Sequence, residues 1–84
     1  MVTVRYFASA RAAAGVTEER LDLASLAEPT LAALLASLES GHGERLARVL
    51  AAASYLVDGV VWHDRAATLP DGATIDVLPP FAGG

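Results

Sequence analysis

The stretch Val2-Thr3-Val4-Arg5-Tyr6-Phe7 decides how the rest of the chain is interpreted. Apolar and polar residues alternate along it, which predicts a β-strand with residues 2, 4 and 6 on an inner face. The same alternation puts Phe7 on the outer face. Residues 74–78, near the other end of the chain, alternate in the same way and put Asp76 and Leu78 outward. We therefore expect a strand at each end of the chain.

Between these strands the pattern changes to that of helices. Residues 8–15 are rich in alanine and predict a short helical turn, and residues 18–23 predict a second strand. Two runs then repeat at i, i+3, i+4 and i+7, which is typical of amphipathic helices; their apolar positions are Leu31, Leu34, Leu35 and Leu38, then Leu46, Val49, Leu50 and Ala53. Thr30 supplies a plausible start for the first helix and Gly41 a stop.

An Asp58-Gly59 pair separates two further apolar runs, which predicts a two-residue β-hairpin. The predicted order is therefore strand, strand, helix, helix and three strands. If the first strand lies in the middle of the sheet beside the last, the sheet is mixed. That arrangement is the β-grasp, or ubiquitin-like, α+β fold, with about five strands and two helices on one face. We expect residues 1–84 to form one domain.

Composition excludes several classes of protein. The chain has no cysteine, so disulfides, thiolate metal sites and cysteine nucleophiles are absent. His42 and His63 lack companions at ligand spacing, and we expect no metal site. A net charge of -4 argues against nucleic acid as a partner. No apolar segment approaches the roughly 18 residues that a membrane span needs. A cytoplasmic location is expected.

The chain ends in Pro79-Pro80-Phe81-Ala82-Gly83-Gly84. The prolines fix φ and donate no backbone hydrogen bond, so they end the last strand and hold an extended course. Residues 81–84 add up to about 13 Å of reach. Because glycine has no Cβ, such an end fits a channel too narrow for other residues. We expect residues 79–84 to be a flexible tail that delivers the carboxylate of Gly84, rather than a merely frayed terminus.

The outer face of the predicted sheet is a second candidate site. Phe7 and Leu78 meet there if the first and last strands are neighbours, and Val61 can join them. An apolar cluster on an uncovered sheet face is typical of a partner-binding surface. The alternative is a set of scattered exposed apolar residues, which is common.

Taken together, the chain resembles the MoaD/ThiS ubiquitin-like family, and MoaD, the small sulfur-carrier subunit of molybdopterin synthase, in particular. The likeness covers nearly the whole chain, and its sharpest part is the Pro-Pro-x-x-Gly-Gly end. Thiamine carriers of the ThiS type also end in Gly-Gly but usually lack the proline pair. The matching residues are Val4, Phe7, Ala8, Arg11, Gly15, Val57, Asp58, Gly59, Leu69, Asp71, Gly72, Ile75, Val77 and 79–84.

The resemblance implies a sulfur carrier that is not an enzyme on its own and binds no cofactor. An E1-like (MoeB-like) adenylyltransferase would use ATP to adenylate Gly84, and a sulfur donor enzyme would convert it to a thiocarboxylate. The large (MoaE-like) synthase subunit would use that sulfur to build molybdopterin. Residues 79–83 would form the delivery arm, with docking through Phe7, Val61, Leu78 and a structural or docking role for Arg11.

Three alternatives remain open at the level of sequence. The chain could carry sulfur for thiamine or cysteine synthesis. It could be a ubiquitin-like protein modifier whose Gly84 ends on a target lysine. It could also be a plain β-grasp interaction module with an inert tail. The chain itself contains no lysine, which bars lysine-linked chains of copies but not single attachment.

Overall fold

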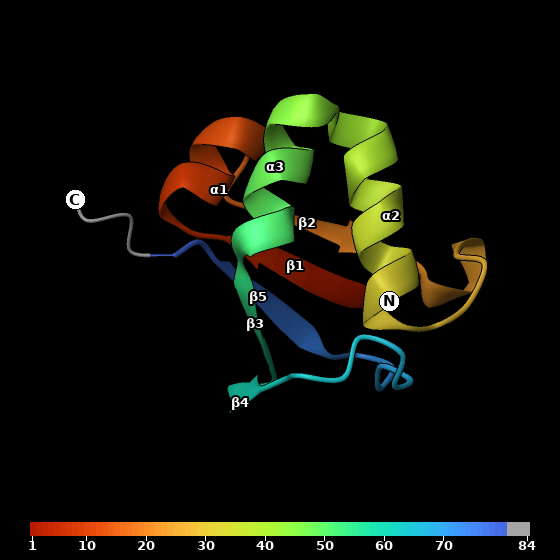
Figure 1. Cartoon of the computed structure of the whole chain (residues 1–84). Helices are drawn as coiled ribbons and strands as arrows, with labels where there is room; N and C mark the ends of the chain where they lie inside the picture. Colours follow the sequence, from red (N-terminus) through yellow and green to blue (C-terminus); the bar gives the residue numbers. More distant parts are fainter. Residues whose placement is uncertain (81–84) are drawn as a thin grey trace.

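The structure is a computed structural model that describes residues 1–80; the predicted tail residues Phe81, Ala82, Gly83 and Gly84 lie outside the described residues. Five strands, three α-helices and one 3-10 helix follow one another along this part of the chain (Figure 1). In order they are β1 (Val2–Tyr6), α1 (Ala8–Ala14), β2 (Glu18–Leu21), η1 (Leu23–Ser25), α2 (Leu31–His42), α3 (Glu44–Ala52), β3 (Ser54–Val57), β4 (Val60–Val61) and β5 (Thr74–Leu78).

The sheet has the order β2-β1-β5-β3-β4, so the first and last strands lie side by side within it. β1 and β5 run parallel, whereas the pairs β1–β2, β3–β5 and β3–β4 are antiparallel. The predicted mixed sheet of the β-grasp fold is therefore confirmed. The helical layer holds three α-helices instead of the expected two, because the alanine-rich turn after β1 is a helix of seven residues. Figure 1 shows these helices on one face of the sheet.

The core lies between the helices and the sheet. The sheet side of the core is formed by alternating strand residues, since every second residue of β1, β3 and β5 points toward the helices. The helical side of the core is formed by the buried leucines of α2 and α3. The buried apolar residues are Val2, Val4, Tyr6, Ala10, Leu31, Leu34, Leu35, Leu38, Leu46, Leu50, Ala53, Tyr55, Val57, Leu69, Ala73, Ile75 and Val77.

Helix α2 begins where the sequence predicts and ends later. The hydroxyl oxygen of Thr30 accepts a hydrogen bond from the backbone N–H of Ala33 at 3.2 Å, which caps the first turn. The predicted stop at Gly41 is wrong, because the helix continues to His42. It ends at Gly43, whose φ of 98° favours glycine.

The predicted hairpin at Asp58-Gly59 joins β3 to β4. Both turn residues have positive φ, 49° and 81°, as a two-residue hairpin turn of this kind requires. Asp58 also ties the turn to the central strand, since its Oδ1 accepts a hydrogen bond from the Thr74 backbone N–H at 2.9 Å. The turn that leads into the edge strand β4 is thereby tied to the start of β5.

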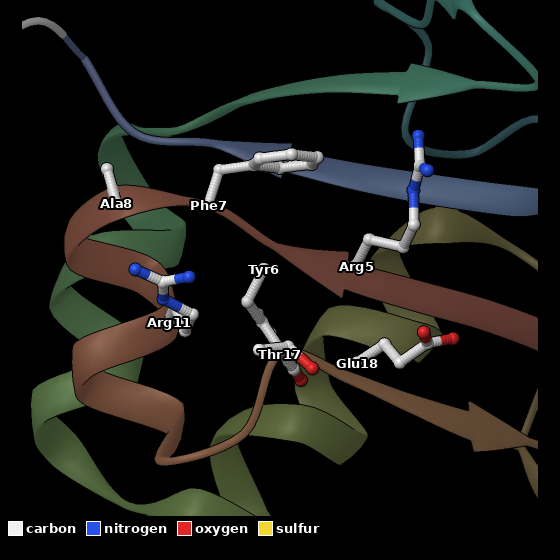
Figure 2. Close-up of a pocket in the computed structure, with 7 residues that line it drawn as sticks. All are labelled: Arg5, Tyr6, Phe7, Ala8, Arg11, Thr17 and Glu18. Carbon is white, nitrogen blue, oxygen red and sulfur yellow. The ribbon is translucent and has the colours of Figure 1, made fainter.

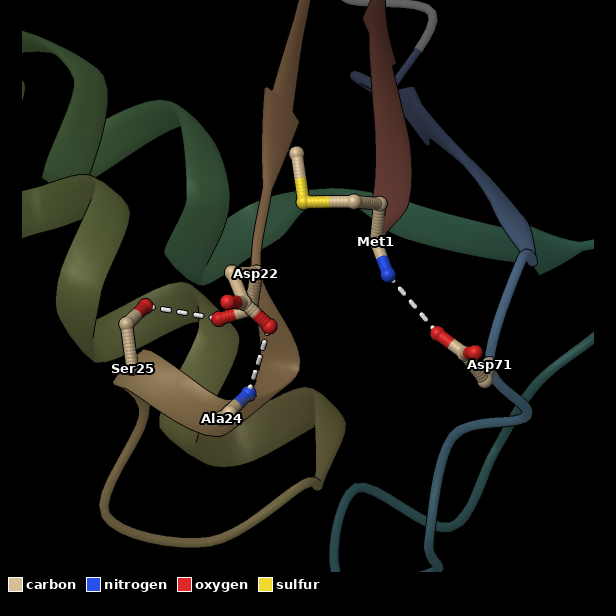
Figure 3. Close-up of polar contacts among 5 residues, drawn as sticks. All are labelled: Met1, Asp22, Ala24, Ser25 and Asp71. Atoms are coloured by element: carbon tan, nitrogen blue, oxygen red, sulfur yellow. Dashed lines mark hydrogen bonds and ion pairs between the residues drawn. The ribbon is translucent and has the colours of Figure 1, made fainter.

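Further polar contacts fix the other loops at the same end of the sheet (Figure 3). Oδ1 of Asp22 accepts a hydrogen bond from the Ala24 backbone N–H at 3.0 Å, and the Ser25 hydroxyl donates to the Asp22 carbonyl at 2.6 Å. The Met1 ammonium donates to Asp71 at 2.7 Å and lowers the pKa of that carboxyl. These contacts hold the loops that precede α2 and β5.

Within residues 1–80, no helix has the length and apolar character needed to cross a membrane.

Candidate functional site

Phe7 lies on the sheet face away from the helices, as strand alternation predicts. It directly follows β1, and its backbone N–H donates to the Val77 carbonyl of β5 at 3.3 Å. The side chain is 40% exposed, and Figure 2 shows its ring lying across β5. Leu78 comes one position later in the parallel register and is half-buried. The structure therefore brings these two predicted docking residues together.

Val61 occupies the same face at the far edge of the sheet. It pairs with Leu56 of β3, which in turn pairs with Asp76 of β5. Val61 is 54% exposed, while Leu56 is half-buried and lies between Val61 and β5. The sequence interpretation missed Leu56, although the alternation of residues 54–57 contains the signal. We call Phe7, Leu56, Val61 and Leu78, with the paired charges of Arg5 and Asp76, the open face.

Asp76 differs from the expectation for an outward-facing residue. It lies on the open face, yet it is only 6% exposed because the Arg5 side chain from β1 pairs with it. Nε of Arg5 donates to Oδ1 at 2.6 Å, and Nη2 donates to Oδ2 at 2.9 Å. These hydrogen bonds and the charge of Asp76 raise the pKa of Arg5. A two-pronged ion pair therefore sits in the centre of the sheet.

Arg11 projects from α1 toward the same region. An open pocket of about 430 Å³ lies beside Phe7 (Figure 2), and its lining residues are Arg5, Tyr6, Phe7, Ala8, Arg11, Thr17 and Glu18. Two arginines and one carboxylate thus border an aromatic ring. The structure places Arg11 next to Phe7, consistent with a docking role, whereas Val61 lies at the other end of the face.

A second polar cluster lies between β2 and the end of α2. Oε1 of Glu19 accepts one hydrogen bond from the Tyr6 hydroxyl at 2.6 Å. The same oxygen pairs with Nε2 of His42 at 2.8 Å. Burial, and then the Glu19 carboxylate, raise the pKa of Tyr6. Both side chains are partly buried, since His42 is 20% exposed and Glu19 is 29% exposed. The cluster fastens the edge strand β2 to the helical layer.

The base of the predicted delivery arm continues the central strand. Pro79 is half-buried and Pro80 is exposed directly after β5. The rest of the arm, Phe81 to Gly83, and the predicted carrier residue Gly84 lie outside the described residues. Because β5 is flanked by β1 and β3, Pro79 and Pro80 follow the sheet beside Phe7 and Leu78.

The described part of the chain has no cluster of metal-binding side chains. No group of three or more His, Cys, Asp or Glu side chains that could hold a metal ion occurs among residues 1–80. What the described residues offer is a surface: apolar side chains around an ion pair, beside a proline-led strand end. Such an arrangement can bind a protein.

The family model of the ThiS family matches residues 4–84, which is nearly the whole chain. The chain belongs to the ThiS family. The match confirms the resemblance to MoaD/ThiS proteins that the sequence motifs indicated, and membership makes the chain a small ubiquitin-like carrier or modifier domain. A comparison with curated proteins gave no match.

Solved structures with this fold come from archaea and bacteria. A protein described as subunit 1 of a molybdopterin converting factor from Pyrococcus furiosus is 29% identical, with a TM-score of 0.78 over 94% of this chain and 95% of that chain. The small archaeal modifier protein 1 of Methanosarcina acetivorans is 25% identical, with a TM-score of 0.78 over 99% and 95%. The complex of subunits 1 and 2 of the Helicobacter pylori molybdopterin-converting factor matches at 24% identity and a TM-score of 0.70, over 99% and 97%, and shows the shared fold.

Proposed function

We propose that this ThiS-family protein is the sulfur carrier of molybdopterin synthesis, with Gly84 as the residue that is charged. The observation that carries the proposal is the family match over residues 4–84, which includes the Pro-Pro-x-x-Gly-Gly end. The position of its two prolines supports the proposal, because Pro79 and Pro80 follow the central strand β5 beside the exposed Phe7. A carrier needs a docking surface and a reactive end on the same side of the molecule.

A free carboxylate is a poor electrophile and has to be activated. An E1-like partner binds ATP, a carboxylate oxygen of Gly84 attacks the α-phosphorus, and pyrophosphate leaves. A sulfide-level sulfur from a donor enzyme then attacks the acyl carbon, AMP leaves, and a thiocarboxylate remains. The chain contributes the carboxylate and, having no cysteine, no thiol of its own that could intercept the activated acyl group.

The remaining site residues have mechanical roles in this proposal. Pro79 and Pro80 stiffen the base of the arm, and Phe81, Ala82 and Gly83 extend it so that Gly84 can enter a narrow channel. The partner protein that receives the arm binds to the open face through Phe7, Val61 and Leu78, with Arg11 beside them. We infer that the target in sulfur transfer is a large synthase subunit, and the inference is supported by the Helicobacter pylori structure of this fold, which is described as a complex of subunits 1 and 2 of a molybdopterin-converting factor.

Intact mass spectrometry tests the proposal after co-expression with the E1-like enzyme and sulfur donor of the same organism. The expected change is the mass gain that accompanies replacement of one oxygen by sulfur. A chain lacking Gly84 should show no gain, and adding the large subunit with its pyranopterin substrate should return the mass of the wild type to its starting value. If a competent activator and donor never change the mass, the carrier function is wrong.

Protein modification is the second candidate. It is favoured by the likeness at 25% identity to a protein named a small archaeal modifier. A modifier predicts conjugates of higher mass that survive denaturation and reduction, with Gly84 joined to lysine of the target. Carriers for thiamine or cysteine synthesis predict the same thiocarboxylate but no discharge by the large synthase subunit. An inert interaction module predicts that removing the tail changes nothing.

A further inference from the structure

An ion pair lies at the centre of the open face, between apolar side chains. Asp76 is on the central strand β5, and Leu56 and Arg5 are its direct neighbours on the adjoining strands. The Asp76 side chain is 8% exposed, whereas that of Arg5 is 49% exposed. Phe7 covers the arginine from one side, with 5.6 Å between the guanidinium carbon and the ring centroid. The carboxylate is therefore already buried, and a docking partner will meet the arginine.

The arginine has unused hydrogen-bonding capacity. A guanidinium carries five N–H donors in a fixed planar fork. Asp76 takes the donors of the edge formed by Nε and Nη2, and no other hydrogen bond from this guanidinium occurs within residues 1–80. The edge formed by Nη1 and Nη2 stays available to a second pair of acceptors. That edge presents two parallel donors, which match a carboxylate better than any single oxygen.

Binding of a partner removes water from the Nη1/Nη2 edge of Arg5, which weakens the complex unless the partner supplies hydrogen-bond acceptors for that edge. A partner that covers Phe7 and Leu78 also removes water from Arg5, because Arg5 of β1, Phe7 directly after β1 and Leu78 of the neighbouring β5 lie on one face. Buried donors of a charged group that lose water without gaining an acceptor weaken binding strongly. The open face therefore binds a purely apolar partner surface weakly, and it binds a surface with a hydrogen-bond acceptor opposite Arg5 more tightly.

We propose that Arg5, held in place by Asp76, is a specificity-determining residue that binds an Asp or Glu side chain of the large synthase subunit. This rests on the proposed function, since it assumes that the open face docks that subunit. Arg11 lines the same pocket as Arg5, and its positive charge attracts the carboxylate of the partner. Glu18 also lines this pocket, and its negative charge repels that carboxylate. Asp76 fixes the orientation of the fork, and Phe7 and Leu78 supply the apolar surroundings.

The test is isothermal titration of the large subunit from the same organism with the full chain and its variants. Arg5→Lys keeps the charge but loses the fork, and we expect the Kd to rise about tenfold or more. Glu18→Gln should lower the Kd. The matched control is Arg48→Lys, since Arg48 also pairs with a carboxylate, Glu44, at 2.8 Å but lies on α3 in the helical layer. Its Kd should equal that of the wild type.

A double-mutant cycle identifies the partner group. Each Asp or Glu of the large subunit's contact surface is changed to its amide and titrated with the wild type and with the variant Arg5→Leu/Asp76→Ala. That variant removes both charges, so it leaves no unpaired carboxylate on the folded chain. One amide substitution should weaken the wild type and leave the double variant unchanged.

Two results are distinguishable in the same titrations. If Phe7→Arg weakens binding while Arg5→Lys and the double variant bind as tightly as the wild type, the role of Arg5 is overturned and the docking face stands. If Phe7→Arg binds as tightly as the wild type, docking through the open face fails, and the proposed function loses the support of that surface. Circular dichroism of each variant confirms that it is folded before titration.

Discussion

Phe7 is the residue on which the docking surface is most directly testable. We expect Phe7→Arg to weaken binding of the large subunit by about thirtyfold or more, because truncated or charged aromatic anchors cost about 2 kcal/mol or more at interfaces. Its thermal unfolding should stay close to that of the wild type, since the side chain is 40% exposed. Titration calorimetry and a thermal melt measure both effects.

Val16→Arg provides the control for this substitution. Val16 is an apolar residue with a similar exposure, 42%, but it lies in the loop between α1 and β2. It should bind like the wild type. Cooperative unfolding of Phe7→Arg at a much lower temperature would mean that Phe7 belongs to the core, contrary to the placement of its ring on the open face.

At the scale of single residues, alternation alone placed Phe7, Leu78 and Val61 on the correct face. The Arg5–Asp76 pair could not be found that way, because it depends on the register between β1 and β5, which no local pattern contains. The pairing of Glu19 with His42 is hidden for the same reason, since the two residues come from different elements. Local patterns predict which side a residue faces, whereas long-range register decides what it meets.

Helix α2 is the element whose start depends most clearly on one side chain. Thr30 is buried, and its hydroxyl oxygen caps the Ala33 N–H. We expect Thr30→Ala to lower the free energy of unfolding by about 1 kcal/mol, the usual cost of losing a helix cap. Urea denaturation followed by circular dichroism measures the change.

Thr30→Ser keeps the capping oxygen and should recover most of this loss. If serine destabilises the protein as much as alanine does, the methyl group of Thr30 in the core matters more than the cap. The start of α2 was predictable because the cap and the leucine repeat are local signals. Its end was not, because Gly41 and Gly43 are alike in sequence and only Gly43 adopts the positive φ that ends the helix.

The same contrast holds for the other elements. The hairpin around Asp58-Gly59 was predicted because its turn needs positive φ at two adjacent positions, which few residue pairs tolerate. Helix α1 was underestimated, since a run of small alanines carries little periodicity even where it forms a full helix. Element type is therefore best predicted where the chain has a strong local requirement.

At the scale of the whole molecule, the order of elements predicted a mixed sheet on the condition that the first strand lies beside the last, and the structure places them side by side. That topology places the proline-led end of β5 next to β1, so Pro79 and Pro80 lie near Phe7. The sequence could not indicate which residue pairs with the negative charge of Asp76 at the centre of the open face. The ion pair there is a property of the assembled sheet, which brings residues 5 and 76 together.

The stability of the whole fold should depend on alkaline pH through its buried tyrosines. The Tyr55 hydroxyl donates to the Leu50 carbonyl at 2.6 Å, and burial raises the pKa of Tyr55 from its ordinary value near 10 to about 12. Burial raises the pKa of Tyr6 as well. Above about pH 10 the unfolded chain releases protons that the folded chain retains, so the free energy of unfolding falls as pH rises.

Urea denaturation of the wild type and of Tyr55→Phe between about pH 8 and about pH 11 measures this effect. At the lower pH we expect Tyr55→Phe to be less stable by about 1 kcal/mol, because the Leu50 carbonyl loses its donor. As pH rises past 10 the difference should shrink, since only the wild type loses the contribution of Tyr55 to stability. Both proteins should still weaken, because each retains Tyr6. A difference that stays constant over the whole range would show that Tyr55 ionises as readily in the folded protein as in the unfolded chain, and its burial beneath α3 would then have no part in resisting alkali.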